Sequence, residues 1–139
     1  MSRGWLIDTN IVSEWVKPRP DPGVVRWLEE VDEERIFLSV VSLAEIRFGV
    51  ERLGVGLRRT RLDEWLRQEL PERFEERIVP VDREVADACG RLLARARRAG
   101  HGLGAMDALI AATCLACDLV LTTRNVADFD GLGVELHRL

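Results

Sequence analysis

Four carboxylates of this chain stand where it is predicted to turn from strand to helix or from strand to loop, and their type and placement indicate metal chemistry. Each lies beside an apolar run but outside its periodicity. They are Asp8, Glu45, Asp107 and Asp128. Magnesium and manganese are hard cations that prefer carboxylate oxygens and keep several bound waters. A cation held in this way offsets the negative charge of a phosphodiester and lowers the pKa of a coordinated water. These residues therefore favour metal-dependent cleavage of a phosphodiester as the leading hypothesis.

Each acid also has a purely structural interpretation. Ser42 and Glu45 fit a capping box, in which Glu45 closes the start of a helix and does no chemistry. Asp107 near a helix N-terminus complements the helix dipole, and Asp8 at a strand end fits an Asx turn. Asp128 lies in a glycine-containing loop and fits a plain turn. All of these interpretations would have to hold together for the site to vanish.

The elements that must position these acids alternate between short apolar runs and helical periodicities. The runs predict strands over residues 4–8, 36–39, 78–81, 119–122 and 134–137. Helices are predicted from an N-cap at Asn10 to residue 16, and then over 24–31, 42–53, 57–74, 83–99 and 105–117. This alternation implies a single α/β domain, residues 1–139, with a mostly parallel sheet of four to five strands covered on both faces. Because ligands of such folds bind outside the carboxyl ends of the strands, the acids could converge there.

Composition sets further bounds. Among the 139 residues, 47% are hydrophobic and 32% are charged, which is typical of a soluble globular protein. The net charge of −4 gives no overall nucleic-acid signature, although local patches matter more than totals. Residues 1–7 show no long apolar region and no cleavage-site pattern, and the most apolar stretch, residues 108–117, is too short to span a membrane. We therefore expect a cytoplasmic protein without a membrane segment.

The cysteines and histidines offer little alternative chemistry. Three cysteines are too few for a disulfide framework, and an odd number cannot all pair with one another. Cys114 and Cys117 have a Cys-x-x-Cys spacing, but they close an apolar helix, whereas a redox pair opens one, so buried packing is the favoured interpretation. Metal-free RNA cleavage often uses two histidines. Nothing indicates that His101 and His137 converge.

Four motifs resemble, in their order, those of PIN-domain ribonucleases, and above all those of VapC-type toxins of bacterial toxin–antitoxin pairs, including the FitB-like branch. The motifs are Leu6-Ile-Asp8-Thr9-Asn10, Ser39-x-x-Ser42-x-x-Glu45, Asp107-Ala-Leu-Ile-Ala-Ala112 and Thr123-Arg-Asn125-Val-Ala-Asp128-Phe129. The resemblance runs nearly end to end. It implies a PIN-like three-layer sandwich and a magnesium-dependent endoribonuclease, with Mn²⁺ as a substitute.

The resemblance also assigns roles to the residues of these motifs. Asp8, Glu45 and Asp107 become an acidic triad, with Asp8 and Asp107 as direct metal ligands. Some family members carry an aspartate directly after Thr-Arg, where this chain has Asn125, so either Asp128 or the Asn125 amide completes the site. The attacked phosphate or a water would be oriented by Thr9, Asn10, Thr122, Thr123 and Asn125.

Partners follow from the same resemblance. It implies an RNA substrate, a cognate antitoxin protein, and a homodimer that could form a hetero-oligomer with that antitoxin. The apolar surfaces around residues 12–15 and 43–53 would serve a symmetric dimer and a groove for the antitoxin's C-terminal segment. An antitoxin arginine that pairs with the acidic pocket would inhibit by competing with the cation.

Two rival interpretations come from other classes of protein. The first is a phosphoaspartyl phosphatase or receiver domain with Asp8 as the nucleophile or phosphoacceptor. In that phosphatase family a second aspartate stands where this chain has Asn10, and both folds use a late lysine, whereas Lys17 is the only lysine here. The second rival is a PIN-like binding module that keeps the fold without the chemistry. The three acids retained in order argue against it.

Overall fold

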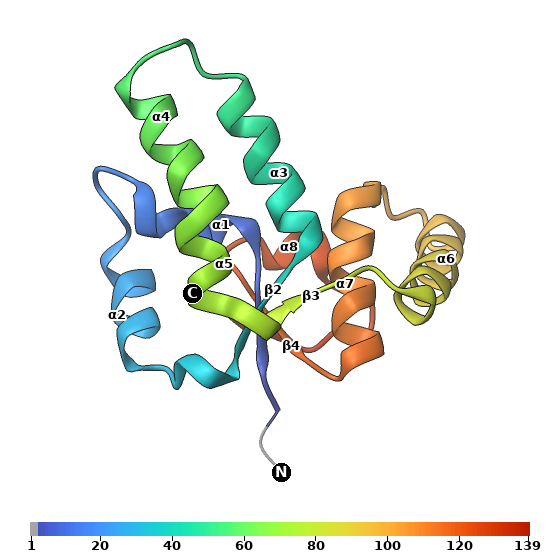
Figure 1. Cartoon of the computed structure of the whole chain (residues 1–139). Helices are drawn as coiled ribbons and strands as arrows, with labels where there is room; N and C mark the ends of the chain where they lie inside the picture. Colours follow the sequence, from blue (N-terminus) through green and yellow to red (C-terminus); the bar gives the residue numbers. More distant parts are fainter. Residues whose placement is uncertain (1–2) are drawn as a thin grey trace.

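The computed structural model describes residues 3–139, in which a five-stranded sheet lies between layers of helices (Figure 1). The strands are β1 (Trp5–Ile7), β2 (Ile36–Ser39), β3 (Ile78–Val79), β4 (Val120–Thr123) and β5 (Leu136–Arg138). They lie in the order β3-β2-β1-β4-β5, and all four pairings are parallel. The predicted α/β class with a parallel sheet of up to five strands is confirmed. All carboxyl ends therefore meet at one edge.

Helical segments connect the strands. They are α1 (Thr9–Val12), α2 (Pro22–Glu30), α3 (Val40–Glu51), α4 (Leu57–Glu64), α5 (Leu70–Phe74), α6 (Arg83–Arg98), α7 (Ala105–Cys117) and α8 (Val126–Phe129). Short 3₁₀ turns are η1 (Ser13–Val16), η2 (Glu33–Arg35) and η4 (Glu75–Arg77). A π-helical segment, η3 (Trp65–Glu69), joins α4 to α5, so the predicted helix over 57–74 is helical throughout but widened in its middle. No helix in residues 3–139 has the length and apolar character needed to cross a bilayer.

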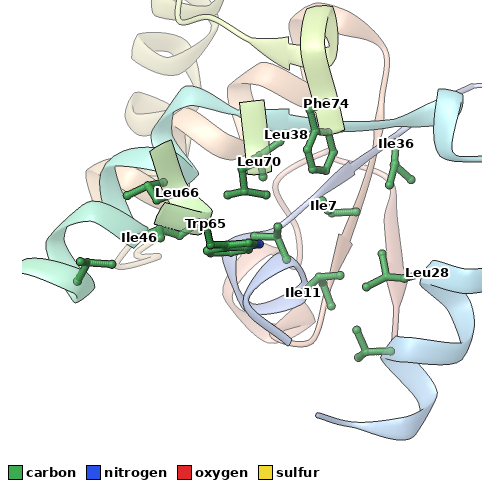
Figure 2. Packing of buried hydrophobic residues seen from close by; sticks show 13 residues of the cluster. Ile7, Ile11, Leu28, Ile36, Leu38, Ile46, Trp65, Leu66, Leu70 and Phe74 are labelled. Carbon is green, nitrogen blue, oxygen red and sulfur yellow. The ribbon is translucent and has the colours of Figure 1, made fainter. Parts of the chain in front are cut away.

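Two apolar clusters fill the space on either side of the sheet. Successive strand residues point to opposite faces, so Ile7 enters one cluster and Leu6 the other. Figure 2 shows the first cluster, in which Trp65 and Phe74 from the α4–α5 region pack toward the strands. Leu92 of α6 belongs to the second. Burial on both faces explains why β1 reads as a continuous apolar run.

Two helix starts differ from the sequence-based prediction. The first helix is capped by Asp8, whose carboxylate accepts from the Thr9 N–H, and not by Asn10. Helix α3 is capped by Ser39, whose hydroxyl oxygen accepts from the Val41 N–H at 3.0 Å, and not by Ser42. In both places the helix begins directly where the strand ends. The functional residues of these segments consequently lie deeper in their helices than predicted.

The cysteine prediction is confirmed in part. All three cysteines are free, and Cys114 is buried in the second cluster. The prediction of buried packing is wrong for Cys117, which is exposed at the end of α7. The helix stops there because Asp118 adopts the left-handed conformation, with φ of 53°.

Candidate active site

The register of the two central strands places Asp8 beside Thr123. Ile7 pairs with Thr122, and the Asp8 N–H donates to the Thr122 carbonyl at 2.9 Å. Asp8 is buried, with 6% of the residue exposed. Its Oδ1 accepts from the Thr9 N–H, and its Oδ2 accepts from the Thr123 hydroxyl, both at 2.8 Å. Two elements far apart in sequence therefore hold Asp8 in a single orientation.

Glu45 reaches the same place from the second turn of α3. The Thr9 hydroxyl donates to Glu45 Oε1 at 2.6 Å and lies 2.9 Å from the Ser42 hydroxyl. Since Ser39 caps α3 and Ser42 is already the third residue of the helix, the capping-box interpretation of Ser42 and Glu45 is wrong. Both side chains instead reach across to the residue that follows Asp8.

The other two acids complete the edge. Asp107 lies half-buried in the first turn of α7, as predicted, and Asp128 lies exposed in α8. Burial raises the pKa of Asp107, and the charges of Asp128 and Glu45 raise it further. The charges of Asp8, Glu45, Asp107 and Asp128 therefore act on one another at this edge of the sheet.

Asp8 shows the strongest electrostatic effect among these acids. Burial raises its pKa to about 6 from the ordinary value of 3.8. Hydrogen bonds from Thr123 and Thr9 oppose this rise, whereas the charges of Asp107 and Glu45 add to it. A buried carboxylate among other carboxylates is strained electrostatically unless a cation joins them.

The part of the chain that the structure describes supplies no such cation. Within residues 3–139, no arginine, lysine or histidine forms an ion pair with Asp8, Glu45, Asp107 or Asp128. In the same range, no three aspartate, glutamate, histidine or cysteine side chains lie close enough together to enclose a metal ion. The acids share an edge and a potential, but their oxygens do not form a closed ligand set. Their convergence on one cation stays a prediction.

The residues predicted to orient the substrate lie in different surroundings. The hydroxyls of Thr9 and Thr123 bind the acids, and the Asn10 side-chain amide lies 3.4 Å from the Thr123 hydroxyl. Asn125 contributes its backbone N–H to that hydroxyl at 3.0 Å, while the residue itself is exposed. Thr122 is not part of the site, because its buried hydroxyl lies 3.3 Å from His137 Nδ1. Alternation along β4 separates it from Thr123.

Two further residues near the site, Glu14 and Arg124, were missed by sequence reasoning. Arg124 stands between Thr123 and Asn125, and its guanidinium lies 3.6 Å from the buried Glu14 carboxylate. A signal was present: Glu14 interrupts the apolar run from Ile11 to Val16. A charged residue inside such a run is buried only when it is paired.

The donor set fits a hard divalent cation in its chemistry. The four carboxylates offer only oxygen ligands, which suit Mg²⁺ and Mn²⁺. Each Asp8 oxygen accepts one hydrogen bond, so each retains lone-pair capacity for a cation. Ligation would require the side chains to draw closer than they lie in this structure.

Comparison with known proteins identifies the class of this chain. Residues 5–131 match the model of the PIN domain family, so the chain belongs to the PIN domain family. It is 36% identical over 131 residues to the protein named toxin FitB of Neisseria gonorrhoeae, with 94% of each chain covered. It is 32% identical over the same length to VapC ribonuclease Y4jK of Sinorhizobium fredii, again with 94% of each chain covered.

The fold agrees with a solved structure. The crystal structure of FitAcB from Neisseria gonorrhoeae superposes with a TM-score of 0.90 at 34% identity, covering 96% of each chain. The PIN-like sandwich that the motifs predicted is therefore confirmed, and so is the likeness to VapC and FitB proteins.

Proposed function

We propose that this chain is a magnesium-dependent endoribonuclease that acts as the toxic component of a toxin–antitoxin pair. The observation that carries the proposal is the mutual charge effect among these acids at one edge of the sheet, where no cationic side chain of residues 3–139 pairs with them. Family membership supports a nuclease, since one relative is named a ribonuclease and another a toxin. Mn²⁺ is expected to substitute for Mg²⁺ because both accept the same oxygen donors.

The residues divide the work of phosphodiester hydrolysis. Bound Mg²⁺ would stabilise the developing negative charge and lower the pKa of a coordinated water. Asp8 and Asp107 would hold the cation, Asp8 being fixed by its two hydrogen bonds. Glu45 binds Thr9 through one oxygen and keeps the other free to aim or deprotonate the attacking water. Asp128 of α8 would complete the negative edge, and the exposed Asn125 directly precedes that helix.

A phosphoaspartyl mechanism at Asp8 finds no support in the structure. That mechanism requires a lysine beside the phosphate, and Lys17 is the only lysine of the chain. The Lys17 ammonium pairs with Glu14 instead. An experiment is needed to distinguish the second rival, a PIN-like binding module without catalysis, from the nuclease.

Cleavage of RNA by the purified chain tests the proposal. Asp8→Asn and Asp107→Asn should each lower the Mg²⁺-dependent rate by more than about 100-fold, because even outer partners of metal ligands cost 10–100-fold. EDTA should abolish cleavage and Mn²⁺ should restore it. Glu51→Gln is the matched control, since Glu51 is an acid of α3 that pairs with Arg47 and Arg59.

Two results would contradict the assignment. Cleavage at the wild-type rate by either aspartate variant would show that the acids do not carry the reaction. An intact wild-type chain that binds RNA without cutting it in Mg²⁺ or Mn²⁺ would support the binding module.

The antitoxin partner has a surface to bind. A groove of about 740 Å³ runs between the segment after α1 and the α4–η3 helix, and Trp15, Leu57, Leu62 and Trp65 are among its lining residues. The structure of FitAcB supports a partner protein for the FitB relative. We propose that an apolar antitoxin segment occupies this groove and blocks the acidic edge. Val12, by contrast, is fully buried and cannot contribute, contrary to the sequence-based expectation for residues 12–15.

Growth assays test the pairing. Expression of the chain alone should arrest growth, and co-expression of the adjacent reading frame should restore it. Rescue should weaken when the exposed Leu57 is replaced by aspartate, because a charge would be buried against the partner. Normal growth without the second frame would contradict a toxin role.

The symmetric homodimer stays a proposal. The exposed Phe48 of α3 offers it an apolar contact. Light scattering of a Phe48→Glu variant would test whether that contact holds the dimer together.

A further inference from the structure

Glu14 is a second buried carboxylate, and its contacts lead toward the acidic edge. Its side chain is 2% exposed. Oε1 accepts from the Asp21 N–H at 2.7 Å. Oε2 pairs with the Lys17 ammonium and lies 3.6 Å from Nη1 of Arg124. One carboxylate thus joins η1, the loop before α2 and the loop after β4.

Arg124 is fixed from both of its ends. Its guanidinium lies against Glu14 and also against Asp21, with Nη2 3.2 Å from Asp21 Oδ2. Its backbone N–H donates to the Asn10 side-chain carbonyl at 3.4 Å. Asp21 is itself held in place, because its other oxygen caps α2. Arg124 therefore ties the loop after β4 to a rigid helix start.

The loop held by Arg124 carries the hydroxyl that orients Asp8. Thr123 directly precedes Arg124, and its hydroxyl donates to Asp8 Oδ2 at 2.8 Å. The same hydroxyl accepts from the Asn10 amide at 3.4 Å and from the Asn125 N–H at 3.0 Å. A continuous path consequently runs from Glu14 through Arg124 and its chain neighbour Thr123 to Asp8.

We propose that Glu14 is a positioning residue of the active site, which acts by holding Arg124 and thereby keeping the Thr123 hydroxyl on Asp8. This inference rests on the proposed function, since it assigns a purpose to the orientation of Asp8. Lys17 shares the Glu14 carboxylate but belongs to no part of this path. A role for Glu14 in stability alone would not involve Arg124 and would not distinguish it from Lys17.

Substitutions at both ends of the path, with Lys17 as control, test the inference in the full-length chain. Glu14→Gln keeps an oxygen for the Asp21 N–H but loses the charge that holds Arg124, and Arg124→Met keeps the apolar stem. Each should weaken Mg²⁺ binding, measured by calorimetry without RNA, by about 10-fold. The double variant should be no weaker than the singles, because both act through one path. Lys17→Met should bind Mg²⁺ like the wild type.

A readout that needs neither metal nor RNA keeps the test independent of the nuclease proposal. The backbone N–H of Asn125 donates to the Thr123 hydroxyl. The hydrogen exchange of this N–H should therefore be about 10-fold faster in Glu14→Gln and Arg124→Met than in Lys17→Met. Unchanged exchange, unchanged Mg²⁺ affinity or additive effects of the two substitutions would overturn the positioning role. If Glu14→Gln did not fold, the partly exposed Arg124 would still allow the same comparison. If the wild type neither bound Mg²⁺ nor cleaved RNA, the proposed function would be overturned instead. Hydrogen exchange would still test whether Glu14 and Arg124 hold Thr123 in place.

Discussion

Asp8 and Glu14 are both buried carboxylates of the same short segment, but their surroundings carry opposite charge. Asp8 is 6% exposed and Glu14 is 1% exposed. Around Asp8 stand Glu45 and Asp107, whose charges oppose its ionisation. Around Glu14 stand Lys17 and Arg124, whose charges favour it. Among residues 3–139, Lys17 and Arg124 neutralise the Glu14 carboxylate, whereas no cationic side chain pairs with Asp8.

The two pKa shifts express this difference. Burial raises the pKa of Asp8 to about 6, and neighbouring acids add to the rise. Burial also opposes ionisation of Glu14, but the hydrogen bonds and charges of its partners win, so that its pKa is lowered. Ionisation of Asp8 therefore destabilises the folded state, whereas ionisation of Glu14 stabilises it. A carboxylate that costs stability without a ligand is typical of a functional site.

The largest stability effect is expected at Asp8. Asp8→Asn should raise the free energy of unfolding in EDTA at pH 7.5 by up to about 3 kcal/mol, the equivalent of a shift from 3.8 to about 6. The sign follows because native Asp8 holds its proton between these values and the unfolded chain does not, so wild-type stability falls as pH rises through that window. Urea unfolding of both proteins at pH 3.5 and 7.5 measures the difference.

The comparison between the two pH values serves as the control. At pH 3.5, below both pKa values, Asp8 is mostly protonated in both states, so the advantage of the variant should largely disappear. An equal advantage at both values would show that Asp8 is not electrostatically strained.

A smaller effect of opposite sign is expected at Glu14. Glu14→Ala should lower the free energy of unfolding at pH 7.5 by about 2 kcal/mol, because the Asp21 N–H and the Lys17 and Arg124 cations lose their buried partner. The cations are partly exposed, which keeps the loss below that of a fully buried pair. Since the pKa of Glu14 is lowered, its contribution is present above the ordinary value of 4.5 and disappears as pH falls below it. If Glu14→Ala were as stable as the wild type at pH 7.5, ionised Glu14 would not stabilise the fold, and the difference from Asp8 would be refuted.

Sequence alone predicted the fold more completely than the site. A short apolar run located β2 and a longer, nearly all-apolar stretch located α7 at their observed bounds, because burial decides both the pattern and the element. Strand ends predicted where the acids would lie, since parallel strands end at one edge. The helix starts were wrong at Asn10 and Ser42, because capping depends on which hydroxyl or carboxylate reaches the first amides.

The contacts between distant residues could not be predicted in this way. Thr122 and Thr123 are identical in type and adjacent, yet only Thr123 binds Asp8, because the register of β4 decides which hydroxyl faces the acids. The pairing of Glu14 with Arg124 joins residues from opposite ends of the chain. Such pairs depend on tertiary geometry, for which a single sequence carries no local pattern.

The smallest expected effect concerns Mg²⁺ itself and sharpens the contrast most directly. At ten times its dissociation constant, Mg²⁺ should stabilise the chain at pH 7.5 by about 1.4 kcal/mol through mass action. A cation must displace the Asp8 proton, so affinity should fall about tenfold per pH unit below a pKa of about 6. At pH 5 the same Mg²⁺ concentration should therefore stabilise by only about 0.4 kcal/mol. Thermal unfolding with and without Mg²⁺ at the two pH values measures both.

Two variants separate the pocket around Asp8 from that around Glu14 in this experiment. Asp8→Asn should show no Mg²⁺-dependent stabilisation at either pH, since the ligand that titrates is gone. Lys17→Met should keep the wild-type response, because Lys17 neutralises only Glu14. Equal Mg²⁺ stabilisation of the wild type at pH 5 and 7.5 would mean that the ion binds elsewhere. The acidic edge would then be an electrostatically strained feature of the fold that Mg²⁺ does not relieve.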